Sequence, residues 1–196
     1  MMKHAKATLA LFMFTLSLSL SANLWANEQY QIDSKGMHAS IMFKIKHLGY
    51  SWLTGRFNDF NGNFTFDKKN PHKSSVHVTI NTATLDTNHA ERDKHLRGDE
   101  FFNVAKFPQA VFKSSKVVVA KNEKTKIHGL LTLHGVSKNI IITANEIGAG
   151  KDPWGGFRRG FEGKVTLSLS DFGFNFNLGP ASKEVELSLY IEGIKQ

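Results

Sequence analysis

Phe161-Glu162-Gly163-Lys164-Val165-Thr166-Leu167-Ser168-Leu169-Ser170 is the stretch that decides the fold, because apolar or small residues alternate in it with polar ones. Successive side chains on a β-strand point to opposite faces, so this alternation predicts a strand with one buried face. The same period of two recurs in residues 39–46, 76–80, 110–119, 127–133, 140–144 and 184–191. About eight strands without intervening helices argue against a doubly wound sheet, and no repeat indicates a propeller. A β-sandwich or a closed barrel remains.

Turn signals separate these strands, and one segment departs from the period of two. His134-Gly135-Val136-Ser137 predicts a tight hairpin, whereas Asn61-Gly62 predicts either a hairpin turn or a bulge in one long bent strand. Asn88 followed by Glu91 predicts the start of a short helix, with Gly98 as its C-cap. We expect this helix to brace or plug one end of the barrel.

The N-terminus has the three parts of a secretory signal peptide: basic Lys3 and Lys6, an apolar run over residues 7–20, and Ala26 at the expected cleavage site. Cleavage after Ser21 and an uncleaved anchor are the alternatives, although the run is shorter than the roughly 20 residues of a membrane span. We therefore expect residues 1–26 to be removed and residues 27–196 to form one domain in the periplasm.

Composition narrows the chemistry. The chain has no cysteine, so disulfides, cysteine nucleophiles and thiolate metal sites are excluded. The formal charge is +8 at pH 7, with its basic residues scattered instead of grouped in a stripe, so we expect no nucleic-acid partner. The 16 phenylalanines could fill a core or line a cavity.

An ordered set of short motifs resembles the YceI-like family of periplasmic polyisoprenoid-binding proteins. The most distinctive is Arg92-Asp93-Lys94-His95-Leu96-Arg97, followed by Phe101-Phe102. The other motifs are Lys46-His47-Leu48-Gly49, Gly55-Arg56-Phe57, Gly129-Leu130-Leu131-Thr132-Leu133-His134-Gly135, and Asp171-Phe172-Gly173. The resemblance implies an all-β, antiparallel, eight-stranded lipocalin-like barrel with one short helical insertion. It also implies an isoprenoid ligand, such as a ubiquinone or a polyprenyl phosphate, and no further cofactor. Leu169 departs from the polar or basic residue that the family often has there, which leaves head-group preference open.

The inward faces of the predicted strands carry almost no charge and are the candidate ligand-binding surface. These lumen residues are Ile41, Phe43, Ile45, Val78, Ile80, Phe112, Leu131, Ile142, Val165, Leu167, Val185 and Leu187. The alternative is that they touch only one another as a solid core. Arg158 and Arg159, with Trp154 in a glycine-rich loop, are candidate head-group ligands, against the alternative of an exposed charged loop.

Catalysis and metal binding are weaker hypotheses. A lipid-acting hydrolase or isomerase would use Asp93 and His95 as acid and base, but their spacing with Arg97 and Glu91 is also that of helix-surface ion pairs. No histidine pair has the i, i+4 spacing of a helical zinc motif, so we expect no metal site. We therefore expect a non-enzymatic lipid carrier. A structural barrel without ligand, transient contact with the inner membrane, and a homodimer stay open.

Overall fold

A computed structural model describes residues 27–36, 38–119, 124–176 and 179–196. The expected signal peptide, residues 1–26, lies outside this described part. Within it, eleven strands and one α-helix form: β1 (Glu28–Ile32), β2 (Ser40–His47), β3 (Ser51–Phe57), β4 (Phe60–Phe66), β5 (Ser75–Asn81), β6 (Leu85–Asp86), α1 (Ala90–Arg97), β7 (Gln109–Val119), β8 (Thr125–Leu133), β9 (Val136–Lys151), β10 (Phe157–Ser168) and β11 (Glu184–Lys195).

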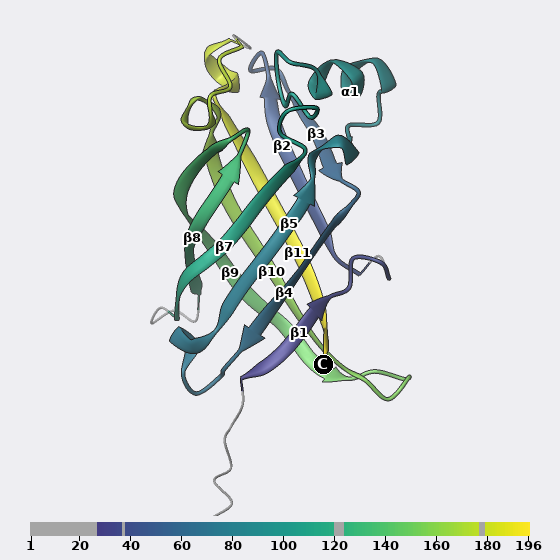
Figure 1. Ribbon diagram of the computed structural model, residues 1–196, viewed down its shortest axis with the longest axis vertical. Helices are drawn as coiled ribbons and strands as arrows, with labels where there is room; N and C mark the ends of the chain where they lie inside the picture. Colours follow the sequence, from purple (N-terminus) through teal and green to yellow (C-terminus); the bar gives the residue numbers. More distant parts are fainter. Residues whose placement is uncertain (1–26, 37, 120–123, 177–178) are drawn as a thin grey trace, which may run out of the picture.

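The strands close into an antiparallel barrel with eight positions around its axis (Figure 1). β11 pairs with β2 through residues 185–190 and with β1 through residues 193–195, so β1 and β2 follow one another along the same neighbour. β1 also pairs with β4, which closes the ring β1-β4-β5-β7-β8-β9-β10-β11. The predicted eight-stranded antiparallel barrel is confirmed. In the first half of the chain, β1 and β2 share the edge of β11 instead of forming one continuous strand.

The region around Asn61-Gly62 is neither a hairpin turn nor a bulge. Both residues lie inside β4, where Gly62 pairs with Val78. Gly62 is needed because a Cβ there would collide with the His77 carbonyl oxygen of β5. The chain bends instead at residues 58–59, where the Asn58 amide donates to the Thr84 carbonyl outside the sheet. The alternation of residues could not show where the chain bends, because the Thr84 carbonyl that binds the Asn58 amide comes from another part of the chain.

Helix α1 covers the end of the barrel that is uppermost in Figure 1, as expected for a segment bracing one end. We call this the upper end; the opposite end, with β1 and the C-terminus, is the lower end. The helix begins one residue later than predicted: His89 is the N-cap and its Nδ1 accepts from the Arg92 amide, while Asn88 has a φ of 60°. Gly98 is the C-cap, as predicted. Among the described residues, no helix has the length and apolarity to cross a membrane.

Candidate functional site

The barrel is hollow. A lower cavity of about 820 Å³ and an upper cavity of about 420 Å³ lie along its interior. The two cavities lie next to each other along the barrel, because the same four side chains line both: Ile41, Ile80, Leu131 and Leu187. The interior is therefore an apolar lumen of two adjacent cavities with a narrower middle at these four side chains, instead of a core in which opposite walls touch throughout.

All twelve apolar side chains that alternation assigned to the inner face line this lumen. Besides the four shared residues, Val78, Phe112, Ile142 and Val165 line the lower cavity, and Phe43, Ile45, Leu167 and Val185 line the upper cavity. That they contact a ligand stays a prediction. The lining contains further residues that our list omitted, such as Leu189 and Ile191, although the same alternation points to them. Leu169, the departure from the family pattern, lines the upper cavity.

Glycines opposite phenylalanines help to keep the lumen open. A Cβ on Gly55 would collide with the ring of Phe43, and a Cβ on Gly129 would collide with the ring of Phe112. Each phenyl ring therefore lies over bare backbone of the neighbouring strand, where a larger residue would push it away from the wall. Aromatic side chains can thus line the barrel without filling its centre.

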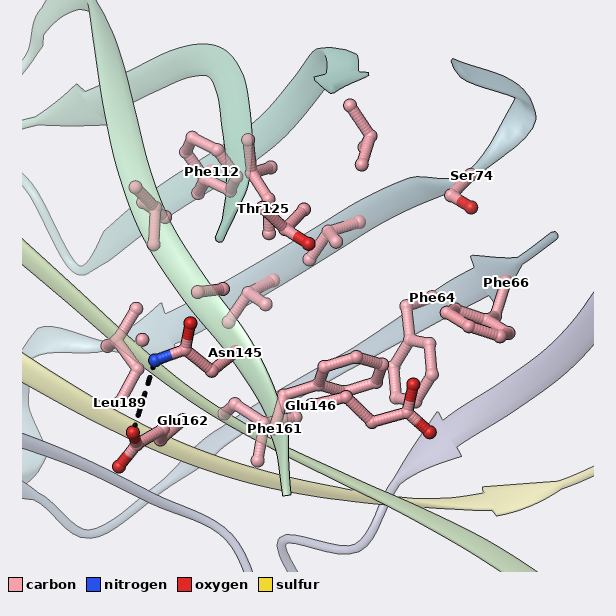
Figure 2. A pocket seen from close by; sticks show the side chains of 18 of the residues that line it. Phe64, Phe66, Ser74, Phe112, Thr125, Asn145, Glu146, Phe161, Glu162 and Leu189 are labelled. Carbon is pink, nitrogen blue, oxygen red and sulfur yellow. Dashed lines mark hydrogen bonds between the residues drawn. The ribbon is translucent and has the colours of Figure 1, made fainter. Parts of the chain in front are cut away.

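The lower cavity becomes polar toward one side (Figure 2). The ring of Phe161 packs there against Phe64 and Phe66, with ring centroids 5.5 Å and 5.9 Å apart. Figure 2 shows the Glu146 carboxylate beside these rings, and the Asn145 amide donating to Glu162 over 3.3 Å. The lower cavity therefore has an aromatic wall with acidic groups next to it.

Arg159 joins neighbouring strands of the lower end from within the barrel wall. Its guanidinium, 10% exposed, is 3.9 Å from the Phe66 ring centroid and donates to Tyr30, Glu146 and Glu28. Burial alone would lower the pKa of Arg159, but the Tyr30 hydrogen bond and the two carboxylates outweigh it and raise that pKa. Arg159 is thus a fixed cation that is already neutralised by its neighbours.

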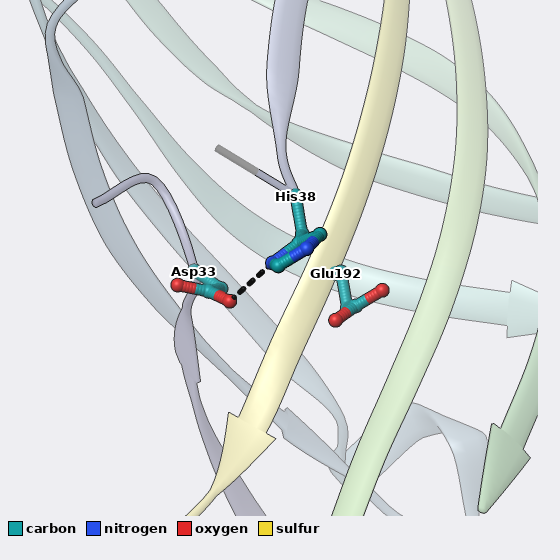
Figure 3. Close-up of side chains that lie close together, drawn as sticks. All are labelled: Asp33, His38 and Glu192. Atoms are coloured by element: carbon teal, nitrogen blue, oxygen red, sulfur yellow. Dashed lines mark hydrogen bonds and ion pairs between the residues drawn. The ribbon is translucent and has the colours of Figure 1, made fainter. Parts of the chain in front are cut away.

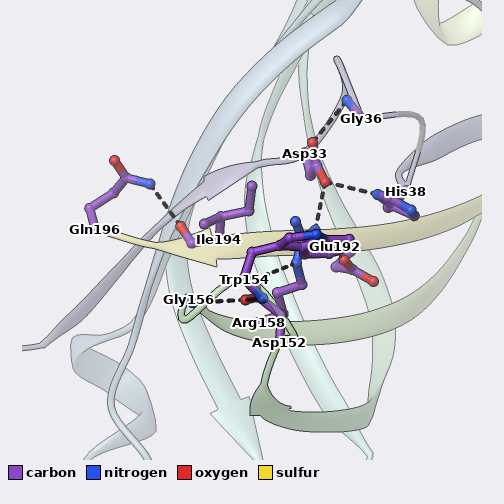
Figure 4. Close-up of polar contacts among 10 residues, drawn as sticks. All are labelled: Asp33, Gly36, His38, Asp152, Trp154, Gly156, Arg158, Glu192, Ile194 and Gln196. Carbon is purple, nitrogen blue, oxygen red and sulfur yellow. Dashed lines mark hydrogen bonds and ion pairs between the residues drawn. The ribbon is translucent and has the colours of Figure 1, made fainter.

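Arg158 faces the other side of β10 and forms a second ion-pair network (Figure 4). Its guanidinium donates to Asp33 and Glu192, each over 2.6 Å, and to Asp152 over 2.9 Å. Burial would raise the pKa of Asp33, but hydrogen bonds from Arg158, His38 and the Gly36 amide outweigh it and lower that pKa. This network fastens the chain after β1 to β10 and β11.

Asp33, His38 and Glu192 place one possible ligand atom each within 4.8 Å of one another (Figure 3). His38 Nδ1 lies 2.9 Å from Asp33 Oδ2. The guanidinium of Arg158 already contacts both carboxylates. A metal ion would have to displace that cation, so the geometry is that of an ion-pair network.

The structure does not bring the candidate head-group residues to the lumen. Arg158, Arg159 and Trp154 do not line either cavity, and both arginines are held by carboxylates. Trp154 is 77% exposed, and the Arg158 guanidinium lies 5.4 Å from its ring centroid. Their role as head-group ligands stays a prediction that the geometry does not favour.

The helix motif is mostly structural. Asp93 is 6% exposed and accepts from the Thr87 amide and hydroxyl, and Arg92 donates to the same residue. The predicted surface pairs Glu91–His95 and Asp93–Arg97 are not among the ion pairs of the described residues, because Asp93 points inward to the chain before the helix. His95 lines the upper cavity but pairs with Glu100 at 2.8 Å. Asp93 and His95 therefore do not form an acid–base pair facing the lumen.

The rim of the upper cavity contains residues that sequence reasoning missed as site residues. Leu48, Phe101 and Phe176 line it, and Leu48 and Phe176 are about half exposed. Phe101 and Phe176 pack together with centroids 4.7 Å apart. The motif Lys46-His47-Leu48-Gly49 supports the family resemblance, but its residues do not indicate that this turn lies at a cavity mouth.

Comparison with known proteins agrees with this architecture. A UPF0312 protein of Pseudomonas aeruginosa is 56% identical over 198 residues, covering 100% of both chains. The protein YceI of Salmonella heidelberg is 52% identical over 96% of this chain and 95% of its own. A crystal structure of Campylobacter jejuni YCEI protein is 33% identical, with a TM-score of 0.70 over 78% of this chain and 90% of its own.

A more distant neighbour shares the fold at 15% identity, with a TM-score of 0.63 over 85% of this chain and 98% of its own. It is described as a polyisoprenoid binding domain from Saccharophagus degradans. The family model of the YceI-like domain matches residues 30–193, which are nearly all of the described barrel. The chain therefore belongs to the YceI-like family.

Proposed function

We propose that this protein is a periplasmic carrier that sequesters one long-chain isoprenoid lipid, of the ubiquinone or polyprenyl phosphate type, in its lumen. One observation carries the proposal: two apolar cavities lie end to end inside a closed barrel, and Ile41, Ile80, Leu131 and Leu187 line both. The expected signal peptide supports the periplasmic location. The description of the Saccharophagus neighbour as polyisoprenoid-binding supports the ligand class.

The size and shape of the lumen suit an elongated ligand. Ligand cavities typically measure about 300–1,000 Å³, and the two cavities together lie at the upper end of that range or beyond it. β11 has 12 residues, so at ~3.3 Å per residue and a tilt of ~40° the barrel is roughly 30 Å long. A lumen of that length accommodates an extended chain better than a compact molecule.

Burial of hydrocarbon supplies the affinity. Each buried CH₂ contributes about 0.8 kcal/mol, so ten to fifteen buried carbons give roughly 8 to 12 kcal/mol before the cost of ordering a flexible chain. No hydrogen bond inside the lumen is required for this. Specificity for the polar end would come from groups at the mouths, of which the lower side offers Asp67, Lys68, Lys124 and Glu146 and the upper side Lys46 and Arg92.

A lipid-acting hydrolase or isomerase is less favoured. Such an enzyme needs an acid and a base within reach of a bound polar group. Asp93 is occupied by Thr87 and does not line a cavity, and His95 is paired with Glu100. A barrel without ligand is disfavoured as well, because it has no need of an open lumen.

Native mass spectrometry of protein isolated from the periplasm, followed by organic extraction, tests the proposal. We expect the folded protein to carry the added mass of one isoprenoid lipid, which identifies the head group and the tail length. Mature protein that retains no lipid, and that binds neither a ubiquinone nor a polyprenyl phosphate when they are offered, would contradict it.

A further inference from the structure

The β2–β3 hairpin places an exposed apolar tip at the mouth of the upper cavity. Leu48 is 53% exposed, Tyr50 87% and Trp52 47%. Leu48 also lines the upper cavity, so this tip is part of the rim through which the lumen meets solvent. Across the same mouth Phe176 is 45% exposed. Large apolar groups gathered at one opening are a feature of interaction surfaces.

The backbone conformation at position 48 of this tip favours a residue other than leucine. Leu48 has a φ of 52° and Gly49 a φ of 86°, and the Tyr50 amide closes the turn onto the His47 carbonyl over 2.9 Å. Turns with two positive φ angles favour Asn followed by Gly, and a leucine held there is strained. The chain therefore holds an apolar side chain at the tip against a local conformational preference.

Cations lie beneath the apolar tip. Lys44 Nζ is 4.3 Å and Lys46 Nζ 5.6 Å from the Trp52 ring centroid. Lys44 also pairs with Glu186, whereas residues 38–57 themselves contain Lys44, Lys46 and Arg56 and no acidic residue. Tryptophan and tyrosine with neighbouring lysines suit the boundary between lipid tails and anionic head groups.

We propose that Leu48, Tyr50 and Trp52, with Lys46, form a membrane-docking surface that seats the upper mouth on an anionic phospholipid bilayer. This proposal rests on the proposed function, since an isoprenoid that resides in a bilayer would then pass between bilayer and lumen without crossing water. The lower end has its own exposed Trp154, but that residue lies outside the cavity linings and beside the neutralised Arg158. Trp154 is therefore the matched control.

Co-flotation with vesicles of phosphatidylethanolamine and phosphatidylglycerol, against vesicles of phosphatidylcholine alone, tests the docking surface. The double substitution Leu48→Asn and Tyr50→Ser should weaken partitioning onto the anionic vesicles by about tenfold, while Trp154→Ser changes it by less than about twofold. Leu48→Asn suits the turn, so the variant should keep its fold and its circular dichroism spectrum.

A second readout uses the absence of cysteine from the chain. An environment-sensitive dye on Tyr50→Cys should shift its emission to the blue with anionic vesicles, and the same dye on Trp154→Cys should not. Equal flotation of wild type and double variant, or a shift only at residue 154, would overturn the docking surface. Dimerisation of the free protein that the double variant abolishes would assign the surface to a second copy instead, and would overturn it too.

Binding of an isoprenoid delivered from ethanol separates the two proposals. Wild-type protein that binds this lipid but does not float contradicts the docking surface and leaves the carrier function standing. Wild-type protein that floats but holds no isoprenoid contradicts the carrier function and supports a membrane contact with another role. The single variant Tyr50→Ser, whose side chain lies outside both cavity linings, should bind the ethanol-delivered lipid as the wild type does.

Discussion

The two ends of the barrel differ in how their charges and apolar groups are arranged. At the lower end, Arg158 and Arg159 are held by carboxylates from β1, β9 and β11, and Asp33, directly after β1, is bound to Arg158 of β10. At the upper end, Leu48, Tyr50 and Phe176 are exposed around a cavity mouth. The charged groups of the lower end join its strands through ion pairs, whereas the upper end leaves large apolar groups exposed to water.

This difference assigns the two ends different roles: the lower end stabilises the fold, and the upper end serves the exchange of ligand. Buried, hydrogen-bonded ion pairs stabilise a barrel seam only while each partner is present, so the lower end tolerates little change. Exposed apolar residues contribute little to the fold, so the upper end can change without unfolding the protein. We therefore expect substitutions at the lower end to act on stability, and substitutions at the upper end or inside the lumen to act on ligand.

Arg159→Met gives the largest expected effect, because it leaves Glu28, Glu146 and Tyr30 without their common donor. We expect a loss of about 2–3 kcal/mol in the free energy of unfolding, toward the low side of values for broken buried pairs because the carboxylates are about one-third exposed. Urea unfolding measures this loss. Lys44→Met, which breaks an exposed pair, is the control and should cost less than about 1 kcal/mol. Equal losses for the two substitutions would show that the Arg159 network stabilises the fold no more than an exposed ion pair does.

Leu187→Trp should block the narrow middle of the lumen, between the two cavities. We expect isoprenoid occupancy to fall by at least about tenfold, equivalent to about 1.4 kcal/mol, with a small change in stability because the added ring can extend from the narrow middle into the neighbouring cavity. Ligand extraction and thermal unfolding check the two parts. Leu130→Trp, at an outward-facing position of β8, is the matched control and should retain the lipid. Full retention by Leu187→Trp would place the ligand outside the lumen.

Acid should loosen the lower end first. The pKa of Asp33 is lowered in the folded protein, so its contribution to stability is present above the unfolded value of about 3.9 and is lost as pH falls through the folded value. Hydrogen-exchange protection factors, corrected for intrinsic rates, should fall in β1 before they fall in β3. Asp33→Asn should remove part of the acid dependence. An acid dependence that is identical in wild type and variant would contradict the role of this network.

Trp154→Ser should have the smallest effect. The side chain is 77% exposed and outside the cavity linings, so we expect stability to change by no more than about 0.5 kcal/mol and lipid occupancy to stay the same. Loss of occupancy in this variant would revive the hypothesis that Trp154, Arg158 and Arg159 bind a head group.

The lumen could be predicted from sequence because it depends on a local period. Alternation fixes which side chains face inward, and the family resemblance supplies barrel closure; together they predict twelve residues, all of which line the lumen. Neither could show that the barrel is hollow. That depends on pairs such as Phe43 with Gly55, in which a ring from one strand lies over a glycine of the next.

The charged residues were harder to interpret, because their partners are distant in sequence. Arg158 bonds to Asp33, 125 residues away, and Arg159 to Glu28, 131 residues away. Two adjacent arginines next to a glycine-rich loop therefore resemble an anion site in the sequence, although both lie on β10 and both charges are already paired. The turn at Leu48 was also hard to predict from the sequence, because a residue with positive φ is usually Asn or Gly and not Leu.

A crystal structure of protein isolated with its natural ligand tests the central claim most directly. The account predicts continuous electron density for a chain-like molecule that passes between Ile41, Ile80, Leu131 and Leu187 and joins the two cavities. Opposite walls in van der Waals contact along the axis, with no room for a guest molecule, would contradict it.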